Sequence, residues 1–271
     1  MTARPPFTWI VLGSGSILPR AGHGPAGNAL APTDAERVTL FDCGPGTLRS
    51  LGAAGFGAHA IERVVVSHFH PDHCLDLFAL AFARRNPSGP ACGDLELVGP
   101  RGLAALLERG AATFGTRSWT RFERTSVVEV EPGERLERGA LELRCAPTRH
   151  TPEALAWRAE LGGCSVTFSG DSGEVEELAA LAAGTDLFAC ECSFPDDRAV
   201  EHHLTPSGAA RIARAADVGA LLLTHFYPEL EPEDARRVAA RTFSGRIELA
   251  HDLSRHVPAP RPSAERRAAR P

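Results

Sequence analysis

A cluster of side chains that can bind metal ions lies directly after a short apolar run of this sequence. Three histidines and an aspartate fall within six residues, at His68, His70, Asp72 and His73. The preceding run Val64–Val66 predicts a buried strand, because β-branched apolar residues favour strands. In an extended chain His68 and His70 project to the same side, whereas Asp72 and His73 turn into the next helix and can face a second ion. Zinc accepts imidazole nitrogens and carboxylate oxygens, so the cluster predicts a metal site at the end of this strand.

Strand-like and helix-like segments alternate along the chain, which is typical of a layered α/β fold. Strands are predicted near Thr8–Leu12, Val38–Phe41, Val64–Val66, Leu95–Val98, Val127–Val130, Leu141–Cys145, Ser165–Phe168, Leu187–Cys190, Leu221–Leu223 and Ile247–Ala250. Helices are predicted near Gly46–Gly52, His73–Arg85, Arg101–Thr113, Glu174–Ala183, Pro206–Ala216 and Pro232–Arg241. The helix at Pro206 has clear entry signals, because Thr205 can cap it and proline suits the first helical position.

Composition and length limit the possible classes of protein. A chain of 271 residues with 43% apolar residues can bury a large core, and we expect one domain over residues 1–255 with a disordered tail over residues 256–271. The net charge of −5 argues against a protein that coats nucleic acid. Seven cysteines, an odd number, predict a reducing compartment rather than a disulfide framework. With no signal peptide and no membrane-spanning run, we expect a cytoplasmic protein without a membrane partner.

The pattern HxHxDH after a buried strand resembles the metallo-β-lactamase superfamily. Upstream, Asp42 in the sequence FDCGPGT (41–47) is similar to the aspartate of the family's DxGxGT turn, which supports the metal loop. Downstream, three further candidate ligands each follow a predicted strand in the family's order: His150, Asp171 and His225. The sequences VVVSHFHPDH (64–73) and LLLTHFYPEL (221–230) also echo one another, as expected if two half-sheets each deliver ligands to one centre. The resemblance covers roughly residues 7–252 and implies a four-layer αβ/βα sandwich.

The resemblance implies two Zn²⁺ ions per chain, with Mn²⁺ or Fe²⁺ as alternatives. The implied ligands are His68, His70 and His150 for one ion and Asp72, His73 and His225 for the other, with Asp171 between them. Two dications a few ångströms apart repel one another unless an anionic bridge lies between them, and Asp171 with a hydroxide supplies one. Metal-bound water has its pKa lowered to about 7, which makes a nucleophile at neutral pH.

Details within the superfamily are similar to ribonuclease Z and its close relatives. These are the opening VLGSGSILPR (11–20), the FDCGPGT turn, and the sequence His203-Leu204-Thr205, which resembles an HxT element whose histidine donates a proton beside the scissile phosphate. The implied reaction is hydrolysis of a phosphodiester by a metal-bridging hydroxide, with Asp72 and His203 as catalytic residues. We expect a lowered pKa for His203, because the positive end of the dipole of the helix predicted at Pro206–Ala216 lies nearby. His202 is an adjacent alternative, and Glu191 is a candidate to orient His203.

One departure from ribonuclease Z concerns the substrate. In that family a long arm that binds transfer RNA is inserted in the sequence between the third-motif histidine and the bridging aspartate. In this chain only twenty residues, Thr151 to Gly170, separate the corresponding positions, and they predict a simple hairpin. This departure and the acidic charge argue against processing of transfer-RNA 3′ ends. We therefore expect a small phosphodiester or an RNA as substrate, and the resemblance implies a homodimer. The arginines and aromatics near residue 120 are candidates to hold a phosphate and stack on a base: Arg117, Trp119 and Arg121.

Other chemistries on the same fold remain alternatives at this point. They are a hydrolase of carboxylic or sulfate esters, lactones or β-lactams, an iron-dependent persulfide dioxygenase, and a scaffold that has lost its metals. The HxT element favours phosphodiesters, and the complete ligand set favours two zinc ions over a single iron or none. Cys190 and Cys192 are predicted to be buried free thiols rather than zinc ligands.

Overall fold

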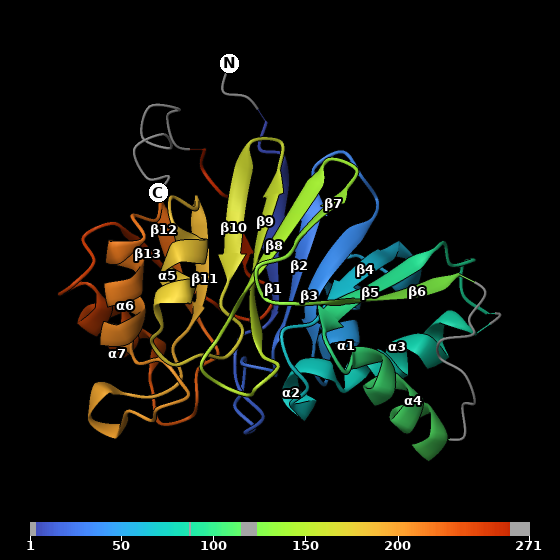
Figure 1. The fold of residues 1–271 in the computed structure, drawn as a ribbon, viewed down its shortest axis with the longest axis horizontal. Coiled ribbons are helices and arrows are strands. Elements are labelled where there is room, and N and C mark those ends of the chain that lie inside the picture. The colour runs from blue at the N-terminus through green and yellow to red at the C-terminus, as the bar shows by residue number, and fades with distance from the viewer. Residues whose placement is uncertain (1–3, 87, 115–123, 261–271) are drawn as a thin grey trace.

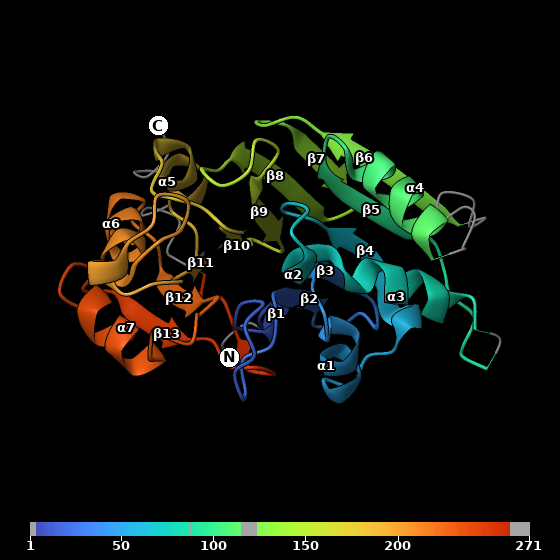
Figure 2. The same ribbon diagram turned by 90° about the horizontal axis from the view of Figure 1, so that it is seen from below.

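The structure, a computed structural model, describes residues 4–86, 88–114 and 124–260. Within these residues the strands form two seven-stranded sheets. Helices α1–α4 lie on one side of the strands and α5–α7 on the other (Figure 1), and the view from below shows the same separation (Figure 2). No helix among the described residues is both long enough and apolar enough to span a bilayer.

The first sheet combines an antiparallel half and a parallel half. Its order is β14 (Arg255–His256), β1 (Phe7–Gly13), β2 (Gly27–Pro32), β3 (Val38–Cys43), β4 (Ile61–Val65), β5 (Leu95–Pro100) and β6 (Thr125–Val130). Strands β3 to β6 run parallel to one another, and β14 to β3 pair antiparallel. The helices of this half are α1 (Thr47–Ala53), α2 (Pro71–Cys74), α3 (Asp76–Arg84) and α4 (Leu103–Thr113), with a short 3₁₀ helix at Ala58–Ala60.

The second sheet repeats this plan. Its order is β13 (Arg246–Leu249), β12 (Ala220–Thr224), β11 (Leu187–Glu191), β10 (Cys164–Phe168), β9 (Leu155–Leu161), β8 (Leu141–Pro147) and β7 (Arg135–Arg138). Strands β10 to β13 run parallel and β7 to β10 pair antiparallel. The helices of this half are α5 (Glu176–Ala182), α6 (Pro206–Ala215) and α7 (Pro232–Ala239), with a short 3₁₀ helix at Asp196–Arg198.

Three groups of buried apolar side chains hold the layers together. The central group joins the inner faces of both sheets, and in it Trp9 packs on Phe41 and Phe168 at ring-centroid distances of 5.0 and 6.2 Å. A second group joins the first sheet to α1, α3 and α4, and a third joins the second sheet to α5, α6 and α7. The layers are therefore helix, sheet, sheet and helix, and the predicted αβ/βα sandwich is confirmed.

The structure differs from the predicted elements at a few places. Strand β2, GNALAP, was not predicted, because Gly, Asn and Pro are rare in strands; pairing on both sides with β1 and β3 overrides that preference. The predicted helix 73–85 is divided into α2 and α3. Strand β14 includes His256, so the sheet extends one residue past the predicted domain boundary at 255. Residues 261–271 of the predicted tail lie outside the described residues.

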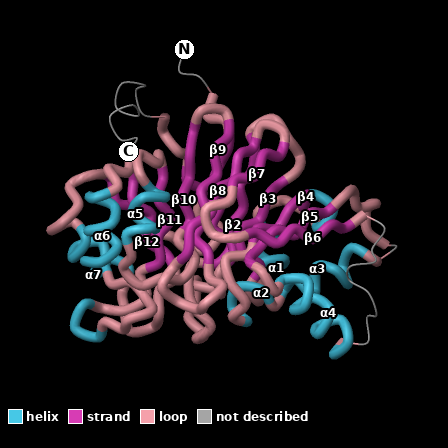
Figure 3. The backbone as a smooth tube through the Cα atoms, in the orientation of Figure 1, coloured by secondary structure: helices cyan, strands magenta, loops and turns pink. Residues whose placement is uncertain are grey.

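The two parallel halves bring several loops to one edge of the sheets. Strands β4, β10, β11 and β12 all end there, and the loops that follow them gather along the lower edge in Figure 3. The predicted hairpin after His150 is confirmed as β9 and β10, which pair antiparallel with no insertion. In open α/β sheets ligands bind beyond the carboxyl ends of the strands, so this edge is the place to look for a site.

Candidate metal centre

Three loops supply the first group of candidate ligands: the loop after β4, the loop before β9 and the loop after β10. The ligand atoms of His68, His70, His150 and Asp171 all lie within 4.8 Å of one another. The Nε2 of His150 lies 2.9 Å from the Nδ1 of His70 and 3.6 Å from Oδ2 of Asp171. Four donor atoms from distant parts of the chain thus converge on one point.

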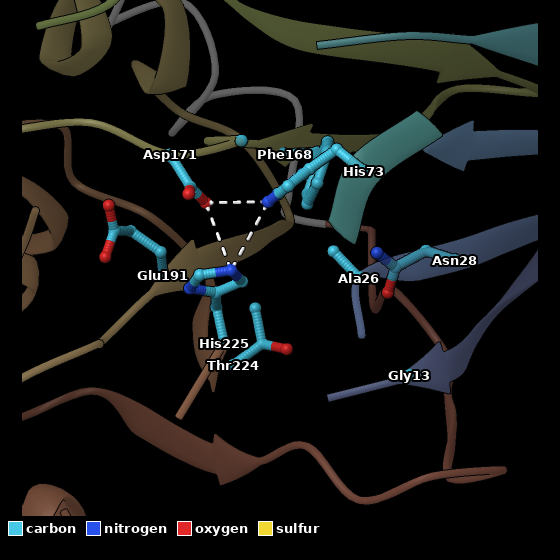
Figure 4. Close-up of a pocket in the computed structure, with 10 residues that line it drawn as sticks. Gly13, Ala26, Asn28, His73, Phe168, Asp171, Glu191, Thr224 and His225 are labelled. Atoms are coloured by element: carbon cyan, nitrogen blue, oxygen red, sulfur yellow. Dashed lines mark hydrogen bonds and ion pairs between the residues drawn. The ribbon is translucent and has the colours of Figure 1, made fainter. Parts of the chain in front are cut away.

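A second group lies on the other side of Asp171. It consists of Asp72 and His73 from α2 and His225 from the loop after β12. The Nε2 atoms of His73 and His225 lie 3.3 and 3.4 Å from Oδ1 of Asp171, as the dashed lines in Figure 4 show. Because Oδ2 of Asp171 faces the first group and Oδ1 faces the second, this one carboxylate lies between both groups.

Hydrogen bonds orient the rings so that their free nitrogens face the centre. His73 donates from Nδ1 to Asp42 at 2.6 Å, and His225 donates from Nδ1 to Oγ of Ser193 at 3.0 Å. His150 donates from Nδ1 to the carbonyl oxygen of His202 at 3.0 Å. With the proton on Nδ1, the neutral form of each ring has a lone pair on Nε2 directed at the centre, which is the arrangement that orients histidine ligands of metal ions.

Asp42 supports this arrangement from below the loop. Its carboxylate is fully buried and accepts hydrogen bonds from the backbone N–H of Ser67 at 2.7 Å, from the Ser67 hydroxyl at 2.8 Å and from His73. The neighbouring Gly44 passes so close to the loop that a Cβ there would lie 1.8 Å from the carbonyl oxygen of Asp72. Glycine is therefore required at this position of the turn, and Asp42 lies where it can hold the metal loop.

The electrostatics of the centre fit bound divalent cations. Burial and the charge of His73 hold the pKa of His68 well below its usual value, so His68 is a neutral imidazole, and its buried Nε2 has no hydrogen-bond partner among the described residues. Burial opposes a charge on His73, yet Asp171 and Asp42 raise its pKa well above the usual value. The site therefore favours positive charge at this point, which a metal ion supplies. The chain's donor set thus fits divalent metal binding.

His203 lies at the edge of the centre and is held by Glu191 at the end of β11. Its Nδ1 donates to the Glu191 carboxylate at 3.0 Å and lies 3.9 Å from Asp171. Burial alone would lower the pKa of His203, but the Glu191 charge outweighs burial and raises it to about 9. The predicted lowering by the helix dipole is therefore wrong, because a carboxylate in direct contact outweighs a partial charge at the end of α6. The predicted cap of α6 is confirmed, with Thr205 accepting from Gly208.

Two side chains that sequence reasoning did not select connect these residues. Ser193 donates its hydroxyl to Glu191 and accepts from His225, which joins the His203 support to a candidate ligand. Ser67 donates to Asp42 and lies 3.0 Å from Nδ1 of His68. The only signal for either serine in the sequence is its position beside a strand end.

Other candidates lie elsewhere. The side chain of His202 is exposed, and only its backbone oxygen reaches the centre. Arg117, Trp119 and Arg121 lie outside the described residues. Cys190 and Cys192 are fully buried free thiols, as predicted.

Comparison with known proteins agrees with the fold. The family model described as "Beta-lactamase superfamily domain" matches residues 37–226. A ribonuclease Z of Mycobacterium bovis (strain BCG / Pasteur 1173P2) is 31% identical over 272 residues, which cover 90% of this chain and 96% of that protein. The metallo-β-lactamase fold protein YhfI of Bacillus subtilis has a TM-score of 0.79 at 25% identity and covers 93% of this chain and 99% of that one. The short form of human tRNase Z has a TM-score of 0.73 at 21% identity, with coverage of 93% and 99%.

These matches identify the chain at two levels. It belongs to the β-lactamase superfamily, with the metallo-β-lactamase fold. Within that superfamily it belongs to the ribonuclease Z-like branch, because the similarity to a ribonuclease Z extends over nearly the whole length of both chains.

Proposed function

We propose that this chain is a metal-dependent hydrolase of phosphodiester bonds that acts on an RNA or a small phosphodiester. The observation that carries the proposal is the position of His203, which is held by Glu191 and lies 3.9 Å from the carboxylate shared by both ligand groups, Asp171. A proton donor at the edge of a dinuclear centre suits a reaction that expels an alkoxide. The relatives named Ribonuclease Z support the same chemistry.

The metals proposed are two Zn²⁺ ions per chain, with Mn²⁺ or Fe²⁺ as alternatives for the same ligands. The proposed ligands are His68, His70 and His150 for the first ion, Asp72, His73 and His225 for the second, and Asp171 between them. When bound, such ions supply a hydroxide nucleophile at neutral pH and positive charge that stabilises the transition state at phosphorus.

The side chains of the chain itself move the protons. With a pKa raised to about 9 by Glu191, His203 carries two ring protons at neutral pH, and because Nδ1 is bound to Glu191 it donates from Nε2. The attacking oxygen of water bonds to phosphorus, the bond from phosphorus to the leaving oxygen breaks, and that leaving oxygen takes the proton of His203. Asp72 is ionised, because the hydrogen bond and charge of its histidine neighbours outweigh burial and lower its pKa, and it accepts the proton that water loses.

The short hairpin of β9 and β10 does not remove transfer-RNA precursors from the substrates to be tested. The similarity to the Mycobacterium bovis ribonuclease Z extends over 90% of this chain and 96% of that protein. A transfer-RNA precursor therefore belongs in the first panel of substrates, beside small phosphodiesters.

Hydrolysis of bis-p-nitrophenyl phosphate tests the reaction class. We expect turnover that a chelator abolishes and added zinc or manganese restores. p-Nitrophenyl acetate is the comparison, since it has the same leaving group on a carboxylic ester. Turnover of the acetate alone by metal-loaded protein would contradict the phosphodiesterase proposal and favour the carboxylic-ester alternative.

A further inference from the structure

We propose that Phe194 and Tyr227 form a stacking site for a flat aromatic group, a nucleobase, on the leaving-group side of the phosphodiester. The inference rests on the proposed function, because the leaving-group side is defined by His203 as the proton donor. It adds a specificity-determining pair and a substrate class, namely phosphodiesters whose leaving group carries a base.

The two rings stand together beside His203. The centroids of the Phe194 and Tyr227 rings are 4.5 Å apart with an interplanar angle of 32°. The centroid of the His203 ring lies 5.6 Å from that of Phe194 and 5.9 Å from that of Tyr227. Both aromatic side chains are only partly buried, so they are not simply part of the apolar core. A leaving group protonated by His203 therefore lies next to an aromatic surface.

Backbone hydrogen bonds hold the three segments in this arrangement. The N–H groups of Ser193 and Phe194 both donate to the carbonyl oxygen of Leu204, at 3.0 and 3.5 Å. The N–H of Tyr227 donates to the carbonyl oxygen of Ser193 at 3.3 Å. The pair is thus tied to the segment that carries His203, and the distance from rings to proton donor is set by the fold.

The loop that carries Tyr227 is also fixed from outside. The mostly buried Arg20 donates to the carbonyl oxygens of Tyr227 and Leu230 at 3.4 and 2.8 Å and forms an ion pair with Glu231 at 2.7 Å. A site that is rigid before binding loses less conformational entropy when a ligand binds.

A nucleobase is the group that suits such a pair. Aromatic side chains bind bases through stacking that tolerates any sequence, because every base presents a flat face. Stacking of one base on an aromatic side chain corresponds to a gain of about 5- to 150-fold in affinity. The pair therefore predicts a preference for substrates with a base on the leaving side over substrates that lack it.

Dinucleoside phosphodiesters test this preference directly. Three substrates are compared: one carries both bases, one lacks the base of the nucleoside on the 3′-oxygen side, and one lacks the base of the nucleoside on the 5′-oxygen side. Hydrogen replaces the missing base in each case. Analysis of the products shows which of the two oxygens is the leaving group. The proteins are the metal-loaded chain, Phe194→Leu, Tyr227→Leu, and the control Phe82→Leu, which removes an exposed aromatic ring on α3. The readout is the ratio of kcat/KM with and without the leaving-side base.

We expect a ratio of about 5 to 150 for the unaltered chain and for Phe82→Leu, and a ratio near 1 for Phe194→Leu and Tyr227→Leu. A purely structural role of the rings would slow both substrates equally and leave the ratio unchanged, and that result would overturn the proposal. So would a ratio near 1 in the unaltered chain.

Failure of the proposed function is distinguishable from failure of the stacking site. If no phosphodiester is hydrolysed by the metal-loaded chain, the proposed function is contradicted, and calorimetric binding of adenosine 5′-monophosphate against ribose 5-phosphate decides the stacking site. Tighter binding of the nucleotide that Phe194→Leu abolishes supports the site, and equal affinities refute it.

Discussion

Asp42→Asn is the substitution that most sharply separates support of the metal loop from general stability. The change keeps the shape of the side chain but replaces Oδ2, which accepts from His73 and from the Ser67 hydroxyl, by an NH₂ group. Oδ1 is kept and still accepts from the Ser67 backbone at 2.7 Å. The Nδ1 of His73 can then no longer donate, and the favoured tautomer places a proton on Nε2, where the metal would bind.

The expected magnitude follows from the bonds that are lost. The Ser67 hydroxyl can rotate to accept from the new NH₂ group, so the net loss is one charge-assisted hydrogen bond from His73, worth about 1.5–3 kcal/mol. Loss of a group that orients a histidine ligand lowers metal affinity about 10- to 100-fold, which corresponds to about 1.4–2.7 kcal/mol. The two estimates agree, and we expect a 10- to 100-fold weaker second metal.

The assay is metal titration by calorimetry, with thermal unfolding of the metal-free protein in parallel. Asp186→Asn is the matched control, because Asp186 is also buried and accepts from the backbone N–H and hydroxyl of one serine, Ser165, at 2.8 and 2.9 Å. We expect the control to lower stability and leave metal affinity unchanged. Equal metal affinity in Asp42→Asn and the unaltered chain would refute the reasoning.

Three further outcomes are expected. Asp171→Ala removes the carboxylate that both ligand groups face, so metal content measured by mass spectrometry should fall for both ions, and a normal content would contradict a shared bridge. His203→Ala should keep its metals yet lower kcat about 100- to 10,000-fold for a dinucleotide. The loss should be far smaller for bis-p-nitrophenyl phosphate, because its leaving group needs no proton. His202→Ala is the control, and equal losses of kcat on both substrates would count against His203 as a proton donor. Burial opposes the charge of Glu96, but its hydrogen bonds to Arg63 and Arg138 outweigh burial and lower its pKa below the usual 4.5. The ionised Glu96 therefore stabilises the fold above pH 4.5, and this stabilisation is lost as the pH falls through the lowered pKa. Glu96→Gln should therefore reduce the free energy of unfolding at pH 7 by about 2 kcal/mol and flatten its decline below pH 4.5 in denaturant titrations, whereas an unchanged acid limb would contradict this account.

The features that the sequence predicted are those set by neighbouring residues. Interactions within a few residues determine the strand before the HxHxDH pattern and the cap of α6 by Thr205. The structure contains both, and the strand spans Ile61–Val65 rather than the predicted Val64–Val66. The resemblance to the family predicted three further candidate ligands and their order in the chain: His150, Asp171 and His225. Strand β2 was missed for the converse reason, because its residues have poor strand propensity and are held by partners on both sides.

The donor groups of this chain, and their positions after predicted strands, could be read from the order of residues alone. How these groups act together depends on the packing of the two sheets. It placed the two oxygens of Asp171 toward different ligand groups and set Glu191 against His203, which reversed the expected direction of the pKa shift. Ring orientation, tautomer and charge depend on contacts of about 3–4 Å between residues far apart in the chain, and such contacts exist only once both sheets have packed.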